Sequence, residues 1–222
     1  MNTSPLSLSL GELAARRPEA IEVLERFGLD YCCGGRRTVA EACAAGGVDA
    51  AAVEAALGAA PPVARSWAEA PLPDLIDHLL AAFHAPHREA FETLARMGAR
   101  VVEAHGGHPT HGAGYREAFA CFRLLAEELE AHMQKEERVL FPWIRAGRGP
   151  TAGEPVRVML SEHDQTAALL ARLRAAAFDY APPVGACATA RGFLAGLAGL
   201  ERALHEHMHL ENNVLFPRAL AG

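Results

Sequence analysis

The stretch HMHLENNVLFP, residues 207–217, occurs 75 residues earlier as HMQKEERVLFP, residues 132–142. Seven of the eleven positions are identical, namely His, Met, Glu, Val, Leu, Phe and Pro. In each copy a histidine and a glutamate are four residues apart, so both side chains share one face if the segment is a helix. The repeat therefore predicts two equivalent helices that carry the same pair of polar groups.

The rest of the chain also has a helical pattern. Apolar residues recur every three or four positions, Ala, Leu, Glu and Arg dominate, and no sustained alternation of β-branched residues occurs. We predict an all-α protein with four long helical segments, at roughly 73–104, 114–146, 154–177 and 187–212. Four helices with short connections are typical of an up-down four-helix bundle.

Proline and glycine divide the chain into parts. Residues 1–58 read as short helices with capping residues, for example Thr38 before one helix and Gly46-Gly47 after it. The segment AAPPVARSWAEAPLP follows. We predict a small helical N-terminal domain at 1–58, a linker at 59–72 and the bundle at 73–222.

Composition excludes some classes of function. The formal charge is −6 and no dense Lys/Arg run occurs, which argues against a nucleic-acid partner. No uncharged apolar run is long enough to span a membrane, and half of the residues are hydrophobic (50%), so we expect a soluble globular protein. The N-terminal residues lack a positive region ahead of a long apolar run, so we expect a cytoplasmic location. Five irregularly spaced cysteines predict reduced thiols and no structural disulfide.

Four histidines and two glutamates fall on the apolar stripes of the four helices. The second stripe consists of Phe122, Leu125, Leu129, His132, Glu136, Val139 and Trp143, and the fourth of Phe193, Leu197, Leu200, Leu204, His207, Glu211 and Val214. The third carries Met159, His163, Leu170 and Leu173, and the first Ile76, Leu80, His84, His87, Phe91 and Leu94. Antiparallel packing would bring these polar groups into one interior volume.

Buried glutamates need strong partners. An uncompensated buried charge costs several kcal/mol, and a domain is stable by only about 5–15 kcal/mol. A single buried His–Glu pair is more often a hydrogen-bonded core pair, but here the stripes hold two glutamates and no lysine or arginine. A pair of metal cations would compensate both. Imidazole and carboxylate donors without thiolate suit iron or manganese. If each glutamate bridges two ions and each ion takes two histidines, a bridging oxide leaves one open position per ion.

The motifs together resemble one known family. DYCCGG (30–35), HAPHRE (84–89), SEHD (161–164) and the two repeated phrases are similar to the iron–sulfur cluster repair di-iron proteins, which have a hemerythrin-like bundle. The resemblance covers nearly the whole chain. Oxygen-carrying hemerythrins differ, because their third helix carries a second histidine where this chain has Ala167.

This resemblance implies a non-haem di-iron centre with His84, His132, His163 and His207 as ligands and Glu136 and Glu211 as bridges. It implies a cytoplasmic stress-response protein that helps to restore iron–sulfur clusters damaged by oxidants or nitric oxide. Its partners would be damaged iron–sulfur proteins and small molecules such as nitric oxide or oxygen. Redox processing of nitric oxide or peroxide is open, and no catalytic residue is assigned.

Further residues are expected around the centre. From spacing alone His87 competes with His84 as the first ligand; the family pattern favours His84 and leaves His87 beside it. Glu128 and Glu162 could face the cavity and relay protons. Pro86 should kink the first helix next to the metal. We expect His105, His108 and His111 to be exposed in a loop, and His78, His205 and His209 to lie off the inner faces.

The adjacent Cys32 and Cys33 form a candidate redox or iron-transfer pair, since Arg36 and Arg37 would lower a nearby thiol pKa. Two small buried residues in a Gly-rich turn are the simpler interpretation. For the whole chain, the alternatives are a sensor or binding protein for oxygen, nitric oxide or iron, and a purely structural bundle. The sequence leaves homodimer formation open.

Overall fold

The structure is helical. The computed structural model describes residues 4–61 and 66–222, and within these ranges every regular element is a helix, apart from one isolated bridge between Ser9 and Thr38. The all-α prediction is therefore confirmed. No helix in the described ranges is long and apolar enough to cross a membrane.

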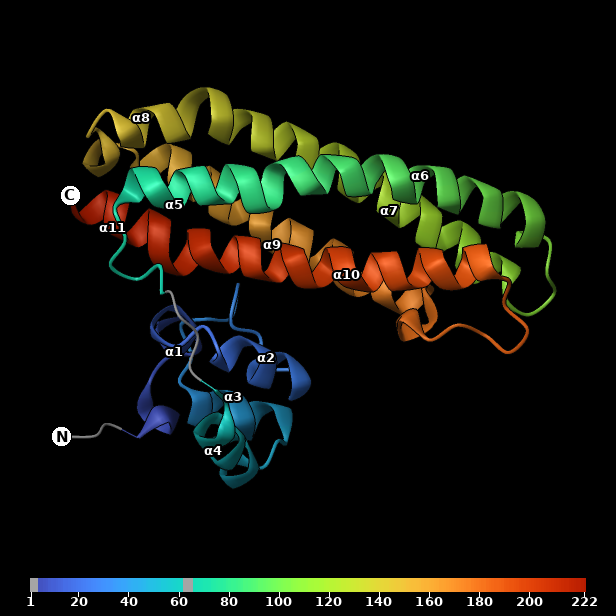
Figure 1. Cartoon of the computed structure of the whole chain (residues 1–222), viewed down its shortest axis with the longest axis horizontal. Helices are drawn as coiled ribbons and strands as arrows, with labels where there is room; N and C mark the ends of the chain where they lie inside the picture. The colour runs from blue at the N-terminus through green and yellow to red at the C-terminus, as the bar shows by residue number, and fades with distance from the viewer. Residues whose placement is uncertain (1–3, 62–65) are drawn as a thin grey trace. The chain divides into compact units, whose positions relative to one another are not determined.

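Four long helical stretches dominate the described chain (Figure 1). They are α5–η2–α6 (Leu72–Leu79, Leu80–His84, Ala85–His105), α7–η3–α8 (Gly112–Lys135, Glu136–Leu140, Phe141–Arg145), α9 (Gly153–Ala176) and α10–η6–α11 (Ala188–Leu210, Glu211–Leu215, Phe216–Ala221). The shorter elements are η1 (Pro5–Ser7), α1 (Leu10–Arg16), α2 (Ala20–Arg26), α3 (Val39–Gly46), α4 (Ala50–Ala59), η4 (Gly149–Thr151) and η5 (Phe178–Tyr180).

Packing divides the chain into two compact units. The first comprises the described residues of Met1–Asp77 together with Trp143–Gly153 and His205–Gly222, and the second comprises His78–Pro142 and Glu154–Leu204. Of the linker predicted at 59–72, residues 62–65 lie outside the described residues, as do residues 1–3 of the predicted N-terminal domain. The predicted domain boundaries stay a prediction, because packing groups segments that are distant along the chain.

Side-chain caps begin α1 and α3, two short helices of the first unit. Ser9 Oγ accepts the N–H of Glu12 at 3.1 Å at the start of α1, and Thr38 forms a capping box with Glu41 at the start of α3. Gly47, with φ 64°, ends α3 in the left-handed conformation that favours glycine. The caps of α3 therefore lie where the sequence predicted them. The core beneath these helices contains Leu13, Leu24, Val39, Val53 and Leu57.

The second unit is held together by large apolar side chains from facing helices. Phe122 on α7 and Phe193 on α10 are fully buried, and their rings meet edge to face with centroids 6.4 Å apart. Gly98 lets α6 approach closely, since a Cβ there would lie 2.3 Å from the ring of Phe119. This tight packing fixes the helices that carry the polar residues.

Three of the long stretches contain a π-helical turn, and a proline follows each one. The N–H groups of Ala85, Phe141 and Phe216 donate to carbonyls five residues back. Pro86, Pro142 and Pro217 come next. A proline lacks an N–H and crowds the carbonyl four residues before it, so a wider turn relieves the conflict.

This local change explains two differences from the predicted helices. The disturbance expected at Pro86 is taken up by η2, and α6 continues through the proline. The fourth stretch extends to Ala221 rather than ending near residue 212, because η6 lets the helix pass Pro217.

The π turn at η3 also shifts the buried stripe by one residue. Val139, predicted to face the core, is 51% exposed, whereas Leu140 is 2% exposed. One helical turn farther along, Ile144 is buried and Trp143, predicted to share the buried stripe, is only half-buried. The prediction for Val139 was wrong because a regular α-helical period was assumed through a turn that holds one extra residue.

This shift is testable by truncating the two neighbouring side chains. We expect Leu140→Ala to lower the free energy of unfolding by about 2–5 kcal/mol, because it leaves a cavity in the core. Val139→Ala should change it by less than about 0.5 kcal/mol, because that side chain is on the surface. Urea denaturation followed by circular dichroism measures both. A larger loss for Val139→Ala would mean that the helix is regular here.

Candidate metal centre

Six polar side chains from the four long helical stretches are buried together. His132, His163 and His207 lie on α7, α9 and α10, His84 is the last residue of η2, and Glu136 and Glu211 are the first residues of η3 and η6. Each is at most 3% exposed. We call these six residues the His–Glu cluster. Three of its members, His84, Glu136 and Glu211, lie in π turns.

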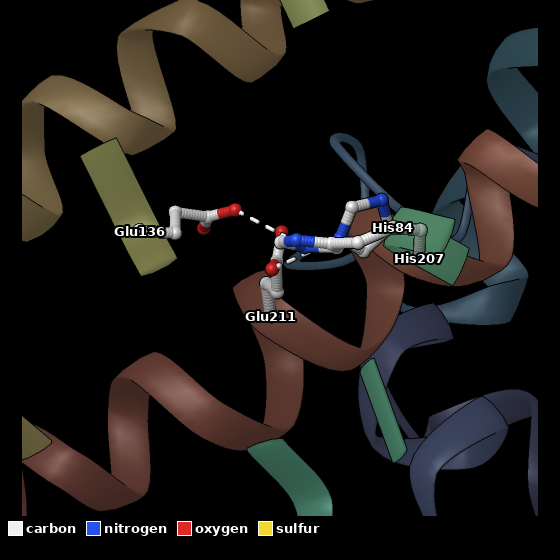
Figure 2. Close-up of side chains that lie close together, drawn as sticks. All are labelled: His84, Glu136, His207 and Glu211. Atoms are coloured by element: carbon white, nitrogen blue, oxygen red, sulfur yellow. Dashed lines mark hydrogen bonds and ion pairs between the residues drawn. The ribbon is translucent and has the colours of Figure 1, made fainter. Parts of the chain in front are cut away.

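The His–Glu cluster consists of two overlapping donor sets. His84 and His207 belong to one set, His132 and His163 to the other, and both sets contain Glu136 and Glu211. Within each set, one donor atom from every residue lies within 4.8 Å of the others. In Figure 2 the carboxylates of Glu136 and Glu211 point toward the imidazoles of the first set.

Individual distances show how the two sets are joined. Glu136 Oε2 lies 3.5 Å from His84 Nε2 and 3.5 Å from His132 Nε2, so one oxygen faces a histidine of each set. His207 Nε2 lies 3.1 Å from Glu211 Oε1. His132 Nε2 and His163 Nε2 face each other at 3.1 Å, a distance at which only one of the two nitrogens can carry a proton.

The residues present fit metal ions. Neither carboxylate oxygen of Glu136 has a hydrogen-bond partner among the described residues, although the side chain is fully buried. A buried carboxylate without compensation costs several kcal/mol, and a bound cation would supply that compensation. The donors are imidazole nitrogens and carboxylate oxygens, and neither set includes a cysteine. Such a donor set can hold two cations that share both carboxylates.

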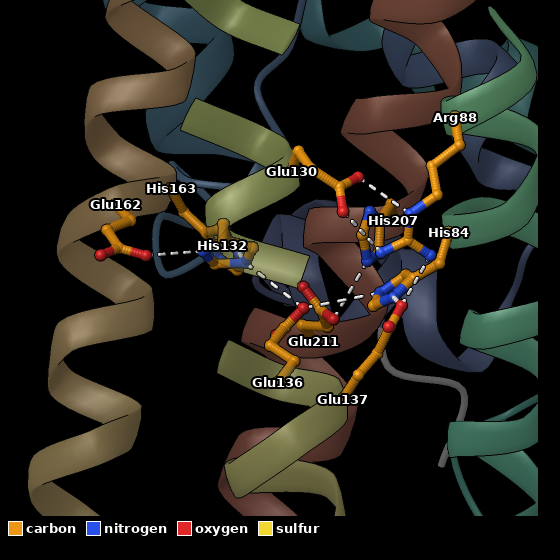
Figure 3. Close-up of polar contacts among 10 residues, drawn as sticks. All are labelled: His84, Arg88, Glu130, His132, Glu136, Glu137, Glu162, His163, His207 and Glu211. Carbon is orange, nitrogen blue, oxygen red and sulfur yellow. Dashed lines mark hydrogen bonds and ion pairs between the residues drawn. The ribbon is translucent and has the colours of Figure 1, made fainter. Parts of the chain in front are cut away.

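Outer carboxylates orient one histidine of each set. His84 Nδ1 lies 2.8 Å from Glu137 Oε1, and His132 Nδ1 lies 2.8 Å from Glu162 Oε2 (Figure 3). A carboxylate at Nδ1 favours the tautomer that keeps its proton there, which leaves Nε2 as a lone-pair donor toward the cluster. The arrangement is the same for both donor sets.

Cations on the neighbouring helices keep these outer carboxylates ionised. Arg88 donates to Glu137 at 2.9 Å and also binds Glu130, while Lys135 pairs with Glu162. Burial acts to raise the pKa of Glu137 and Glu162. Hydrogen bonds from Arg88 and His84 in one case, and from Lys135 and His132 in the other, outweigh burial and hold each pKa below its ordinary value.

Glu162, His87 and Glu128, the other residues predicted around the centre, lie in three different environments. Glu162 contacts His132, as described above, and stays a candidate proton relay. His87 is buried against the rings of Phe83 and Phe91 and belongs to neither donor set. Glu128 is exposed, so the structure does not bring it to the cluster. Successive residues of an α-helix point about 100° apart around its axis, so Glu128 faces away from the core that buries the next residue, Leu129.

The cysteine pair lies in a loop of the first unit that is organised by Asp30. The Asp30 carboxylate accepts the N–H groups of Cys32, Cys33 and Gly34 at 2.9–3.1 Å, and Cys32 Sγ lies 3.8 Å from Cys33 Sγ without a disulfide. The hydrogen bond with Cys33, together with burial and the charge of Asp30, raises the pKa of the Cys32 thiol. The expectation that nearby arginines lower it is therefore wrong for Cys32. The redox or iron-transfer role stays a prediction.

Asn213 joins this loop to the π turn η6 within the first unit. Its Nδ2 donates to the carbonyls of Tyr31 and Cys32, each at 3.2 Å. Gly35 is required for this approach, since a Cβ there would lie 2.6 Å from Asn213 Oδ1. The cysteine loop is therefore bonded to the turn that begins with Glu211. Sequence reasoning missed this contact, because the residues are about 180 positions apart.

His209 also contacts the segment next to the cysteine pair, through Tyr31. It was predicted to lie away from the bundle interior, yet it is fully buried and packs edge to face on Tyr31, with ring centroids 5.3 Å apart. Burial lowers the pKa of His209 to about 4, so the imidazole is neutral at pH 7. The helix therefore buries two faces here, and the sequence pattern identified only one of them.

The fold and the His–Glu cluster define a helical bundle protein with an interior cation-binding site. A family model described as the hemerythrin HHE cation binding domain matches residues 76–219, and one described as a domain of unknown function matches residues 6–61. The chain is similar to proteins named iron-sulfur cluster repair protein YtfE. Those of Escherichia coli O157:H7 and Escherichia fergusonii are each 40% identical to it over 215 residues, with 96% of each chain covered.

The chain belongs to the hemerythrin HHE family, in the group that includes the YtfE iron-sulfur cluster repair proteins. The resemblance inferred from its motifs is confirmed.

The contact between the cysteine loop and η6 can be tested by removing single amides. We expect Asn213→Ala to lower the free energy of unfolding by about 1–3 kcal/mol, because Tyr31 O loses the donor that Asn213 supplies and Cys32 O keeps only the one from Asn212. Asn212→Ala is the matched control: Asn212 donates to Cys32 O at 3.3 Å, and that carbonyl keeps its bond from Asn213. Its loss should be smaller. Equal losses in urea denaturation would contradict the assigned role of Asn213.

Proposed function

We propose that the His–Glu cluster holds two iron ions and that the protein repairs iron–sulfur clusters damaged by oxidative and nitrosative stress. The observation that carries this proposal is the pair of donor sets that share Glu136 and Glu211. The printed name of the relatives, iron-sulfur cluster repair protein, supports the repair role. The clients would be damaged iron–sulfur proteins, and the site of action would be the cytoplasm.

The donors favour iron or manganese over a structural zinc ion, and the proposed repair of iron–sulfur clusters selects iron. Each set offers two imidazoles and two carboxylates, and the absence of thiolate from both sets disfavours a structural zinc site. When bound, the iron pair would supply two redox-active ions with coordination positions open to small molecules. A carboxylate shared between two ions tolerates changes in their charge, and its protonation would weaken the hold on one of them.

The residues around the cluster have separate tasks in this proposal. Glu137 and Glu162 fix the tautomers of His84 and His132, and Arg88 and Lys135 keep those carboxylates ionised. Glu162 is 25% exposed at its side chain, so it can exchange protons with solvent while it contacts His132. Iron donation, nitric oxide processing, or both would use this site.

The ligand assignment predicts the metal content of specific variants. The purified protein should contain two irons per chain. Glu136→Gln should reduce this to about one or fewer, because a neutral amide replaces a shared anionic donor. Glu128→Gln is the matched control on the same helix and should keep two irons, since Glu128 is exposed. Elemental analysis measures the content. Zinc in place of iron, or full iron content in Glu136→Gln, would refute the assignment.

The repair role is tested with an iron–sulfur dehydratase inactivated by nitric oxide. We expect the iron-loaded protein to restore the activity of the dehydratase. If it acts by donating iron, its own iron content should fall at the same time. Glu211→Gln, with a reduced iron content, should restore less. Glu128→Gln should match the wild type.

Other outcomes separate the alternatives. A spectral change with nitric oxide but no recovery of the dehydratase would support a sensor. Recovery together with unchanged iron content and consumption of nitric oxide would favour processing over donation. Failure of both the wild type and the control to restore activity would refute repair.

A further inference from the structure

A second group of reactive side chains lies away from the His–Glu cluster. Cys187 directly precedes α10, and His105 is the last residue of α6. Their side chains meet in the second unit, with His105 Nε2 lying 3.1 Å from Cys187 Sγ. Both residues are half-buried. His105 was expected to be an exposed loop residue, and its contact with Cys187 corrects that expectation.

The environment of Cys187 favours the thiolate. The N–H of Ala190, in the first turn of α10, donates to Cys187 Sγ at 3.4 Å. This bond and the contact with His105 outweigh burial and lower the pKa of Cys187 to about 7. The other titratable group beside the sulfur is Tyr115 on α7, whose pKa is raised by burial and by Cys187. Arg191, one turn into α10, donates to the carbonyl of Ala186.

Three other cysteines, Cys32, Cys43 and Cys121, differ from Cys187. The pKa of Cys32 is raised by its hydrogen bond to Cys33, and burial raises the pKa of Cys43 and of Cys121. Cys121 is an instructive comparison, since its thiol also contacts a side chain, at 3.6 Å from Glu117 Oε1. There the partner is an anion, which disfavours the thiolate. At Cys187 the partner is a base that can take the thiol proton.

We propose that Cys187 and His105 form a second reactive site, in which the thiolate reduces a small hydroperoxide. The thiol proton resides on His105, and the sulfur attacks one peroxide oxygen. The O–O bond breaks as the S–O bond forms. The departing hydroxide or alkoxide takes the proton from His105 and leaves as water or alcohol. Sulfur loses two electrons to the peroxide, and the products are cysteine sulfenic acid and neutral imidazole.

The proposal uses residues outside the His–Glu cluster, so it does not depend on the proposed repair role. Its half-buried sulfur suits a small oxidant better than a macromolecule. A free thiol of another molecule would return the sulfenic acid to the reduced state through a mixed disulfide.

Mapped alkylation of the purified, metal-containing protein tests the nucleophile. At pH 7, iodoacetamide should label Cys187 in preference to Cys121. In His105→Gln, Cys187 should be labelled severalfold more slowly, because its thiol loses the imidazole contact and keeps only the hydrogen bonds from the first turn of α10. The labelling rate should rise with pH around a midpoint near 7 in the wild type and at higher pH in His105→Gln. His108→Gln is the matched control, since His108 Nδ1 instead accepts the N–H groups of Thr110 and His111.

Trapping with dimedone after hydrogen peroxide tests the reaction itself. The adduct should form on the Cys187 peptide in the wild type and in His108→Gln, and decrease severalfold in His105→Gln at unchanged iron content. Circular dichroism and thermal unfolding check that each variant is folded; if His105→Gln unfolds, His105→Asn replaces it. Equal labelling of Cys187 in wild type and the His105 variant would overturn the pair. Fast alkylation without a dimedone adduct would overturn the peroxide reaction.

Discussion

The structure depends on the burial of two carboxylates in an apolar bundle. Glu136 and Glu211 are 0% exposed, and such groups would cost several kcal/mol each if nothing compensated them. Four imidazoles, one from each long helical stretch, converge on them. Because a domain has only about 5–15 kcal/mol of stability, this concentration of polar groups is tolerable only with strong compensation. Bound cations are the compensation that these donors suit.

Three π turns lie at the His–Glu cluster. Each contains one member of the His–Glu cluster, and each precedes a proline. A π turn inserts one residue into the helical period, which redirects the following side chains by about 100°. In η3 this insertion places Leu140 in the core and Val139 on the surface. The conserved chemistry of the two repeated phrases within this chain is thus matched by an identical backbone irregularity.

Charged groups surround His84 and His132, whereas neutral groups follow Glu211. Around His84 and His132, carboxylates backed by Arg88 and Lys135 hold the imidazoles by charge-assisted hydrogen bonds. Beyond Glu211, neutral amides bond to the backbone of the cysteine loop, and the neutral His209 packs on Tyr31. The carboxylates of Glu137 and Glu162 set the tautomer and the orientation of His84 and His132. The neutral amides tie the loop of Cys32 and Cys33 to the turn that begins with a cluster glutamate.

The amino-acid sequence by itself determined the helical class, the repeat and five of the six cluster residues, because polar residues on a period of three and four stand out against an apolar stripe. Spacing left His84 and His87 open as the first ligand; the family pattern favoured His84, which lies in a donor set, whereas His87 belongs to neither. The sequence did not reveal which histidines share a donor set, since that depends on which helices lie next to one another. Val139 was mispredicted because the π turn η3 shifts the helical period. His209 and His105 were mispredicted because each contacts a segment that is distant in sequence, Tyr31 and Cys187 respectively. Only the tertiary structure decided these points, because burial and proton sharing arise from segments that are far apart in the chain.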